Sequence, residues 1–270
     1  MTNPQTPGTR IAPALDGGGH TPDLVLEQGR YRLRFARDEA DLDAIQALRY
    51  EVFNLELGEG LESSHAERRD RDRFDAHCQH LMLEELGSGA VVGTYRLQVA
   101  ETAEAAEGFY TATEFDLAGL PADVRANAIE LGRACIAREH RSRLLLFLLW
   151  KGMWAYMTWN RKRHFFGCCS LTGTDPALGL QALAWLRHGG YVHPTLDVRP
   201  LPGLECVLPP GTSVPEIASF KLPKLFQAYL RYGAVVCGAP AIDREFGTVD
   251  FLAFWDIGKL DPRTLRSLTQ

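Results

Sequence analysis

The stretch that most constrains the fold is IELGRACIA, at residues 129–137, because it places two charges inside an apolar strand-like run. Its apolar residues suit a short buried strand, whereas Glu130 and Arg133 would be costly to remove from water unless they are paired or face a cleft. Residues three apart in a regular strand point to opposite faces. One extra residue near Gly132 would turn both charges to the same side. We therefore predict a bulged strand beside a cleft.

The elements that follow this strand indicate a crossover connection. The turn REHRSR lies at residues 138–143, the apolar run 144–159 reads as a helix, and HFFGCCSL at 164–171 reads as a second strand. A strand, a helix and a further strand in this order are typical of a βαβ unit with parallel strands. The apolar run is shorter than the ~20 residues that span a bilayer, and Lys151 interrupts it. We expect a buried helix.

The rest of the chain indicates one α/β domain of mixed composition. We expect residues 1–29, which are rich in Pro, Gly and Thr, to form a disordered tail, and residues 30–270 to form a single domain. Residues 54–78 are predicted to form a long, charge-dense loop, and loops of that length in compact domains are usually functional or mobile. The other predicted elements are strands at 31–35, 79–85, 91–99, 234–237 and 248–255, and helices from Asp38, at 174–188 and at 221–233.

Charge and cysteine usage exclude several classes of protein. The net charge of -5 gives no broad basic face for nucleic acid. The six cysteines contain no C-x-x-C pair, so we expect reduced thiols, and His77 and His80 lack an evident third metal ligand. No secretory signal is recognisable, which favours a cytoplasmic protein. Basic residues on both sides of the apolar helix keep a peripheral membrane contact open.

Several stretches from residue 31 onward together carry a family resemblance. The stretches are LRYEVFNLELG (48–58), RDRDRFDAHCQHLML (69–83), VVGTYRL (91–97), FYTATEFDL (109–117), ELGRACI (130–136), GTDP (173–176) and AYLRYGAVVCGAPAIDREFGTVDFL (228–252). They resemble the ornithine N-acyltransferases of ornithine-lipid synthesis, also called hemolysin-like, which are related to the acyl-homoserine-lactone synthases. The resemblance implies a GNAT-like acyltransferase fold, a mixed and bent sheet flanked by helices.

The resemblance also implies which residues form the site. Transfer of an acyl group to an amine needs a neutral amine, and a half-buried Glu130 with a raised pKa can take its proton. The alternative for Glu130 is an ion pair with Arg133 or Arg96, and Cys135 is a rival nucleophile. For Asp72 and Asp75 the alternative is that they belong to a solvated loop of mixed charge and contact no substrate. The implied residues are catalytic Glu130, Arg133 and Arg96, and substrate-binding Arg49, Phe53, Asp72 and Asp75.

The turn at 138–143 bears on the acyl donor. Acetyl-CoA enzymes of this fold cradle pyrophosphate with a glycine-rich turn at a helix start, and REHRSR contains no glycine. The resemblance implies that Arg138, Arg141 and Arg143 instead meet the pantetheine phosphate and the acidic surface of an acyl carrier protein. The donor is then the acyl-phosphopantetheine of that partner, and we expect no other cofactor.

These observations predict an N-acyltransferase that moves a fatty acyl chain, which can be 3-hydroxylated, from acyl carrier protein to the α-amine of an amino acid. Ornithine is the leading acceptor by resemblance. The rivals are another amino acid, an acyl-homoserine-lactone synthase and a membrane-active lysin. Glu59 stands where the lactone synthases have a tryptophan, which disfavours a site for S-adenosylmethionine.

Overall fold

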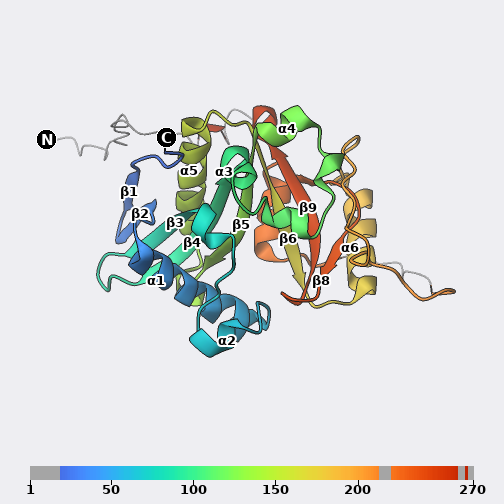
Figure 1. Cartoon of the computed structure of the whole chain (residues 1–270), viewed down its shortest axis with the longest axis horizontal. Coiled ribbons are helices and arrows are strands. Elements are labelled where there is room, and N and C mark those ends of the chain that lie inside the picture. The colour runs from blue at the N-terminus through green and yellow to red at the C-terminus, as the bar shows by residue number, and fades with distance from the viewer. Residues whose placement is uncertain (1–18, 213–219, 261–264, 267–270) are drawn as a thin grey trace, which may run out of the picture.

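The computed structural model describes residues 19–212, 220–260 and 265–266. A nine-stranded sheet runs through the molecule in the order β1-β2-β3-β4-β5-β6-β9-β7, with β8 paired to β9 (Figure 1). The strands are β1 Val25–Gln28, β2 Tyr31–Phe35, β3 Gln79–Glu85, β4 Val91–Val99, β5 Ala128–Ile136, β6 His164–Thr172, β7 Val235–Val236, β8 Ala241–Asp243 and β9 Thr248–Asp256.

Helices cover the sheet and complete a single α/β domain. The α-helices are α1 Glu39–Tyr50, α2 Ser64–Glu67, α3 Ala100–Glu104, α4 Ala122–Ala126, α5 Arg143–Trp159, α6 Pro176–His188 and α7 Lys224–Arg231. A π-helix, Glu51–Leu57, continues α1. The 3-10 turns are Asp75–His77, Tyr110–Thr113, Leu117–Gly119, Arg138–His140 and Ile257–Lys259. No helix in these described ranges combines the length and apolar character needed to cross a bilayer.

The sheet is mixed because one pair of neighbouring strands is parallel. β5 and β6 run parallel and are joined by α5, which confirms the predicted crossover, whereas the other pairs are antiparallel. α5 is buried as expected, with Trp150 only 1% exposed. Alternate residues of β9 enter two apolar cores: Phe251 and Trp255 pack with the α5–α7 side, and Leu252 and Phe254 with the 109–117 segment. Because β9 is covered on both faces, its sequence is a nearly continuous apolar run.

The two parallel strands separate soon after they meet. β5 and β6 pair only over Ala128–Glu130 and His164–Phe166. At the next position a side chain on Gly167 would lie 2.1 Å from the Leu131 carbonyl oxygen, so glycine is needed where the strands are closest. Beyond this point the strands no longer pair, and a cleft lies between them, which confirms the cleft predicted beside residues 129–137.

A bulge in β5 accounts for the spacing of its two charges. Thr94 of β4 pairs with Cys135 and Arg96 with Gly132, so one residue of β4 lies opposite two of β5. The extra residue directly follows Gly132, and Arg133 adopts a left-handed φ of 44°. Glu130 and Arg133 both contact Tyr110 and therefore lie on the same side of the sheet, as predicted.

The structure also differs from the sequence expectations at several ends of elements. Val25–Gln28, which we assigned to the tail, forms β1 and pairs with β2 through a turn at Gly29, whose φ is 61°. The edge of β2 is thereby paired rather than left open. Residues 1–18 of the expected tail, and residues 213–219, 261–264 and 267–270 of the expected domain, lie outside the described ranges. The short elements α3, α4 and β8 were not expected.

Candidate active site

The opening between β5 and β6 is a cleft of about 810 Å³. Its walls come from residues 130–136 of β5, 165–170 of β6 and 223–229 at α7, and residues 141–143 at the start of α5 also line it. Most of these side chains are apolar, so the cleft suits an acyl chain. The few polar groups in its wall therefore define where chemistry takes place.

Glu130 lies at the apex of the cleft, at the last paired position of β5 and β6. Its side chain is buried, with 4% exposed, and accepts hydrogen bonds from the backbone N–H groups of Tyr110 at 3.0 Å and Thr111 at 2.7 Å. Burial raises the pKa of the Glu130 carboxyl, and these hydrogen bonds offset part of the rise. The carboxylate has further lone pairs that can accept a proton. Glu130 forms no ion pair with Arg133 or Arg96 within the described residues, so that alternative is wrong.

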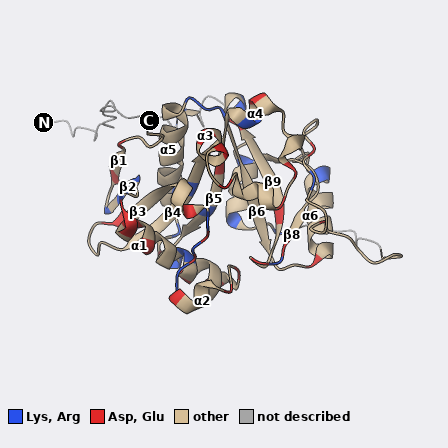
Figure 2. Ribbon diagram, viewed as in Figure 1, with Lys and Arg blue, Asp and Glu red and all other residues tan. Residues whose placement is uncertain are grey.

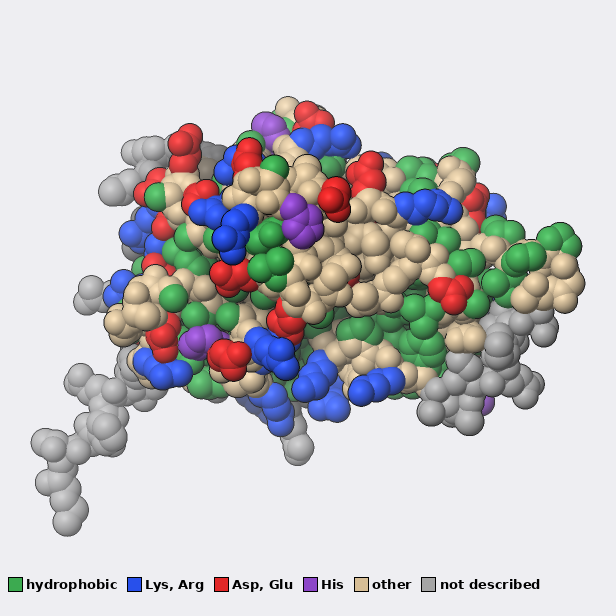
Figure 3. Space-filling view, turned by 90° about the horizontal axis from the view of Figure 1, so that it is seen from below, with side chains coloured by type: hydrophobic (Ala, Val, Ile, Leu, Met, Phe, Trp, Pro, Cys, Tyr) green, Lys and Arg blue, Asp and Glu red, His purple; other side chains and the backbone are tan. Residues whose placement is uncertain are grey.

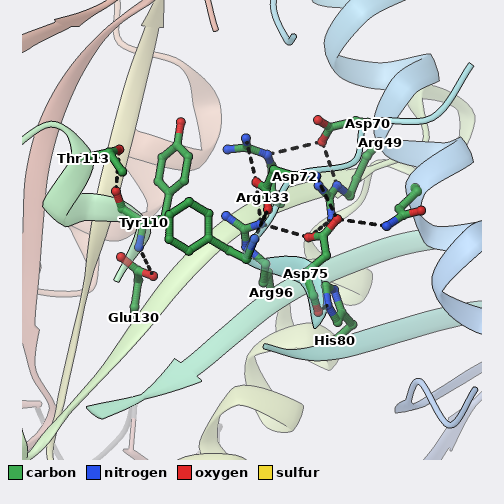
Figure 4. Close-up of polar contacts among 12 residues, drawn as sticks. Arg49, Asp70, Asp72, Asp75, His80, Arg96, Tyr110, Thr113, Glu130 and Arg133 are labelled. Carbon is green, nitrogen blue, oxygen red and sulfur yellow. Dashed lines mark hydrogen bonds and ion pairs between the residues drawn. The ribbon is translucent and has the colours of Figure 1, made fainter. Parts of the chain in front are cut away.

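Three arginines and three aspartates form a buried ionic cage beside Glu130 (Figure 4). α1, β4 and β5 supply the arginines, and the segment after α2 supplies the aspartates. Each arginine bridges two aspartates, which leaves the formal charges balanced. The nitrogen–oxygen distances are Arg49–Asp70 2.7 Å, Arg49–Asp75 2.8 Å, Arg96–Asp72 2.7 Å, Arg96–Asp75 2.9 Å, Arg133–Asp70 3.3 Å and Arg133–Asp72 3.1 Å.

The ionic cage includes both predicted aspartates, Asp72 and Asp75. Asp75 is buried and pairs with Arg49, and the Asp72 side chain is only 9% exposed and pairs with Arg96, so the solvated-loop interpretation is wrong for these two residues. Burial alone would raise the pKa of Asp75, but Arg49 and Arg96 outweigh it and hold the pKa below its usual range. Acidic and basic positions lie close together around α1 and the segment after it (Figure 2). Asp70, which is fully buried, was missed, although it continues the alternating acids of RDRDRFD.

Arg133 connects the cage to the cleft. Its guanidinium lies between two aromatic rings, 4.6 Å from the Tyr110 centroid and 4.3 Å from the Phe246 centroid. Phe53, on the π-helix that continues α1, packs edge-on against Phe246 at 5.5 Å. Arg133 and Phe53 both line the cleft, so the structure brings these predicted residues to one wall.

The start of α5 forms the mouth of the cleft. Arg141 and Arg143 line it, whereas Arg138 does not. Arg141 is not free, because it forms a bidentate pair with Glu56 at 2.6 and 2.7 Å. Lys224 and Arg231 of α7, which sequence reasoning missed, also line this region. Several Lys and Arg side chains lie along the lower edge of the view from below (Figure 3).

A second group of carboxylates was not expected from the sequence. Oxygens of Glu114, Asp243 and Asp250 lie within 4.8 Å of one another, and Asp250 reaches the cleft wall. His80 is buried, and its Nε2 lies 3.0 Å from the Asp75 carbonyl oxygen. Burial lowers the pKa of His80 to about 4, which keeps its ring neutral. Asp243 and Asp250 come from the paired strands β8 and β9, whereas Glu114 comes from a distant segment, so local spacing alone could not reveal the group.

Cys135 also lines the cleft and was the rival nucleophile. Burial raises the pKa of its thiol to about 12, so the reactive thiolate is scarce near neutral pH. We predict that Cys135→Ala changes turnover by less than about tenfold, below the usual effect of losing a catalytic group. Turnover of the variant and the intact mass of wild type mixed with acyl donor alone provide the check. A mass gain of one acyl chain on Cys135 would contradict this prediction.

The bent mixed sheet, the divergent parallel strands and the acyl-sized cleft define an acyltransferase of the GNAT class. Residues 48–151 match the family described as acetyltransferase (GNAT) domain. An N-acyl amino acid synthase from uncultured soil microbes shares the fold, with a TM-score of 0.53 and 10% identity over 86% of this chain and 95% of that one.

Two named relatives are more similar in sequence. The chain is 37% identical over 246 residues to an L-ornithine N(alpha)-acyltransferase of Brucella abortus (strain 2308), with 87% of both chains covered. It is 35% identical over 263 residues to an enzyme of the same name from Agrobacterium fabrum (strain C58), covering 94% of this chain and 90% of that one. The chain therefore belongs to the family of L-ornithine N(alpha)-acyltransferases and is an acyltransferase.

Proposed function

We propose that the protein transfers a fatty acyl chain from the thioester of an acyl carrier protein to the α-amine of ornithine. The observation that carries this proposal is the position of Glu130. A buried carboxylate with a raised pKa lies at the apex of an apolar cleft, where an amine and a thioester can meet. The names of the relatives support ornithine as the acceptor.

The reaction needs no covalent enzyme intermediate. The neutral α-amine attacks the thioester carbonyl, a C–N bond forms, the C–S bond breaks, and the thiol leaves with a proton. Glu130 takes the amine proton directly or through a water molecule. Beyond Glu130, in the described residues, no strand pairs with β5 on the side of β6. On that edge the Ile136 carbonyl already accepts a hydrogen bond from Arg141 Nε at 3.0 Å, and the backbone groups before it can bond to the amides of a pantetheine arm.

Glu59 adds a carboxyl group to the cleft wall. Its carboxyl is 9% exposed, lines the cleft and accepts a hydrogen bond from the Thr172 hydroxyl at 2.5 Å. Burial raises the pKa of Glu59, and the nearby Asp250 adds to the rise. A cationic acceptor would be attracted to this wall.

The donor proposal depends on the basic mouth. Arg138 and Arg143 are exposed and form no ion pair that the described ranges contain, and Arg143 begins α5 at the cleft. We predict that Arg138→Glu together with Arg143→Glu weakens carrier-protein binding about tenfold or more, because such contacts steer association and are screened by salt. Arg187→Glu, the same charge change on exposed α6, is the control. Equal turnover with acyl-coenzyme A, unaffected by the double change, would contradict the carrier assignment.

One reaction mixture tests the proposed function. The purified protein is incubated with acyl carrier protein thioesters and a pool of amino acids, and new lipids are identified by mass spectrometry. We expect an N-acylated ornithine as the main product. An acyl-homoserine lactone formed after S-adenosylmethionine is added, or the absence of any amide, would overturn the proposal.

A further inference from the structure

Glu114, Asp243 and Asp250, here called the acidic group, surround one point on the side of the sheet that carries Glu130. They come from the segment after the Tyr110–Thr113 turn, from β8 and from β9. Asp250 forms part of the cleft wall, whereas the other two lie behind it. Asp250 thus connects the acidic group to the cleft in which transfer is proposed to occur.

The acidic group lacks the counter-charge that the ionic cage has. Among the described residues none of its members forms an ion pair, and Glu114 and Asp250 are only 3% and 2% exposed. Glu114 Oε2 and Asp250 Oδ1 are buried without any hydrogen-bond partner in that part of the chain. Burial raises the pKa of Glu114 well above its usual range, and the nearby Asp250 carboxylate adds to the rise. Buried carboxylates of this kind are stabilised when a cation arrives.

Tyr110 fixes the spacing between the acidic group and Arg133. Its hydroxyl donates to Asp243 Oδ2 at 2.9 Å, while its ring lies against the Arg133 guanidinium at 4.6 Å. The positive group therefore lies over the face of the Tyr110 ring, and a carboxylate of the acidic group lies at the hydroxyl of the same side chain. This arrangement is complementary to a diamino acid, which carries a carboxylate at one end and an ammonium at the other.

We propose that the acidic group binds the side-chain ammonium of a diamino-acid acceptor, while Arg133 faces its α-carboxylate. This inference rests on the proposed function and assigns the residues that select ornithine over neutral amino acids. An ammonium has three N–H donors, one for each carboxylate of the acidic group. The α-amine is then left between the two anchors, toward Glu130.

A divalent metal is the other ligand that such carboxylates suggest. Calcium takes six to eight oxygen ligands, and magnesium requires near-octahedral oxygen coordination. The acidic group is not surrounded by further oxygen ligands alone. The Cys168 thiol lies 3.5 Å from Glu114 Oε1, and the Thr248 hydroxyl already donates to Asp250 at 2.7 Å. The ammonium is therefore favoured, and metal binding becomes an outcome of the test.

Calorimetry with ornithine and norvaline, its neutral analogue of the same chain length, tests the inference without any acyl donor. Charge-assisted hydrogen bonds contribute about 1.5–3 kcal/mol, so we expect Asp250→Asn to weaken ornithine binding roughly 10–100-fold. Norvaline binding should change little. Glu245→Gln, an exposed change close to Asp243 in sequence, should bind ornithine as wild type does. Because Asp250→Asn removes a buried unpaired charge, its melting temperature should stay equal or rise.

Equal weakening of both ligands in Asp250→Asn, or no preference of wild type for ornithine, would overturn the inference. So would binding of magnesium or calcium by wild type that Asp250→Asn abolishes, with no ornithine preference. Failure of acyl transfer with every donor would overturn the proposed function instead. Ornithine binding that depends on Asp250 would still support the acidic group as an ammonium site.

Discussion

Glu130→Gln is expected to lower the turnover of acyl transfer by about 10²-fold or more, the usual scale for loss of a general base. The wild-type rate should rise with pH through the raised pKa of Glu130, because the deprotonated carboxylate is the active form. The pH profile of the variant should lack this rise and should instead follow deprotonation of the α-amine, whose ordinary pKa is about 7.7–8.0. Steady-state turnover across pH provides the measurement.

This variant needs a control, because Glu130 also accepts hydrogen bonds from backbone N–H groups of the Tyr110–Thr113 turn. A glutamine has one carbonyl oxygen, so one of the two backbone N–H groups would face its amide nitrogen. Thr113→Ala loosens the same turn by removing the 2.7 Å bond from Thr113 Oγ1 to the Tyr110 carbonyl, and it leaves Glu130 intact. An equal loss of turnover in both variants, with both pH profiles like wild type, would make Glu130 a structural cap.

Arg49→Met is expected to cost about 3–5 kcal/mol of unfolding free energy, because it leaves buried aspartates with less counter-charge. Arg49 is fully buried and bridges Asp70 and Asp75. The pKa of Asp75 is held low in the folded protein, so the contribution of these pairs is present above the unfolded pKa of about 3.9 and is lost as pH falls. The difference between variant and wild type in urea unfolding should therefore shrink in acid.

Arg69→Met is the matched control for the ionic cage. Arg69 binds both carboxylate oxygens of Asp43 at 2.9 and 2.8 Å, but the pair is partly exposed. An exposed pair contributes less than about 1 kcal/mol. Similar losses in the two variants would show that burial of the cage adds nothing to its contribution.

Features that are local along the chain predicted the bulged strand and the crossover, whereas the GNAT-like fold was implied by the family resemblance. The charges of Glu130 and Arg133, three residues apart, required a bulge, and the structure has one directly after Gly132. The apolar run before residue 160 required a buried helix, and α5 is one. The roles assigned to Glu130, Arg96 and the donor arginines stay predictions.

Other parts of the site depend on contacts between distant segments, which no spacing reveals. The Tyr110 hydroxyl donates to Asp243, which lies 133 residues later in the chain, and its ring contacts Arg133. Arg141 was expected to meet the acyl donor, but Glu56 on the π-helix pairs with it. These pairs join segments that are brought together by the fold and not by proximity in the sequence.

The regiochemistry of the product tests the central claim most directly. The purified protein receives acyl carrier protein thioester and ornithine labelled with heavy nitrogen at the α-amine, and tandem mass spectrometry locates the amide. The account predicts one acyl chain on the labelled α-nitrogen, with the side-chain amine free. An acyl chain on the unlabelled side-chain nitrogen, or no amide at all, would contradict it.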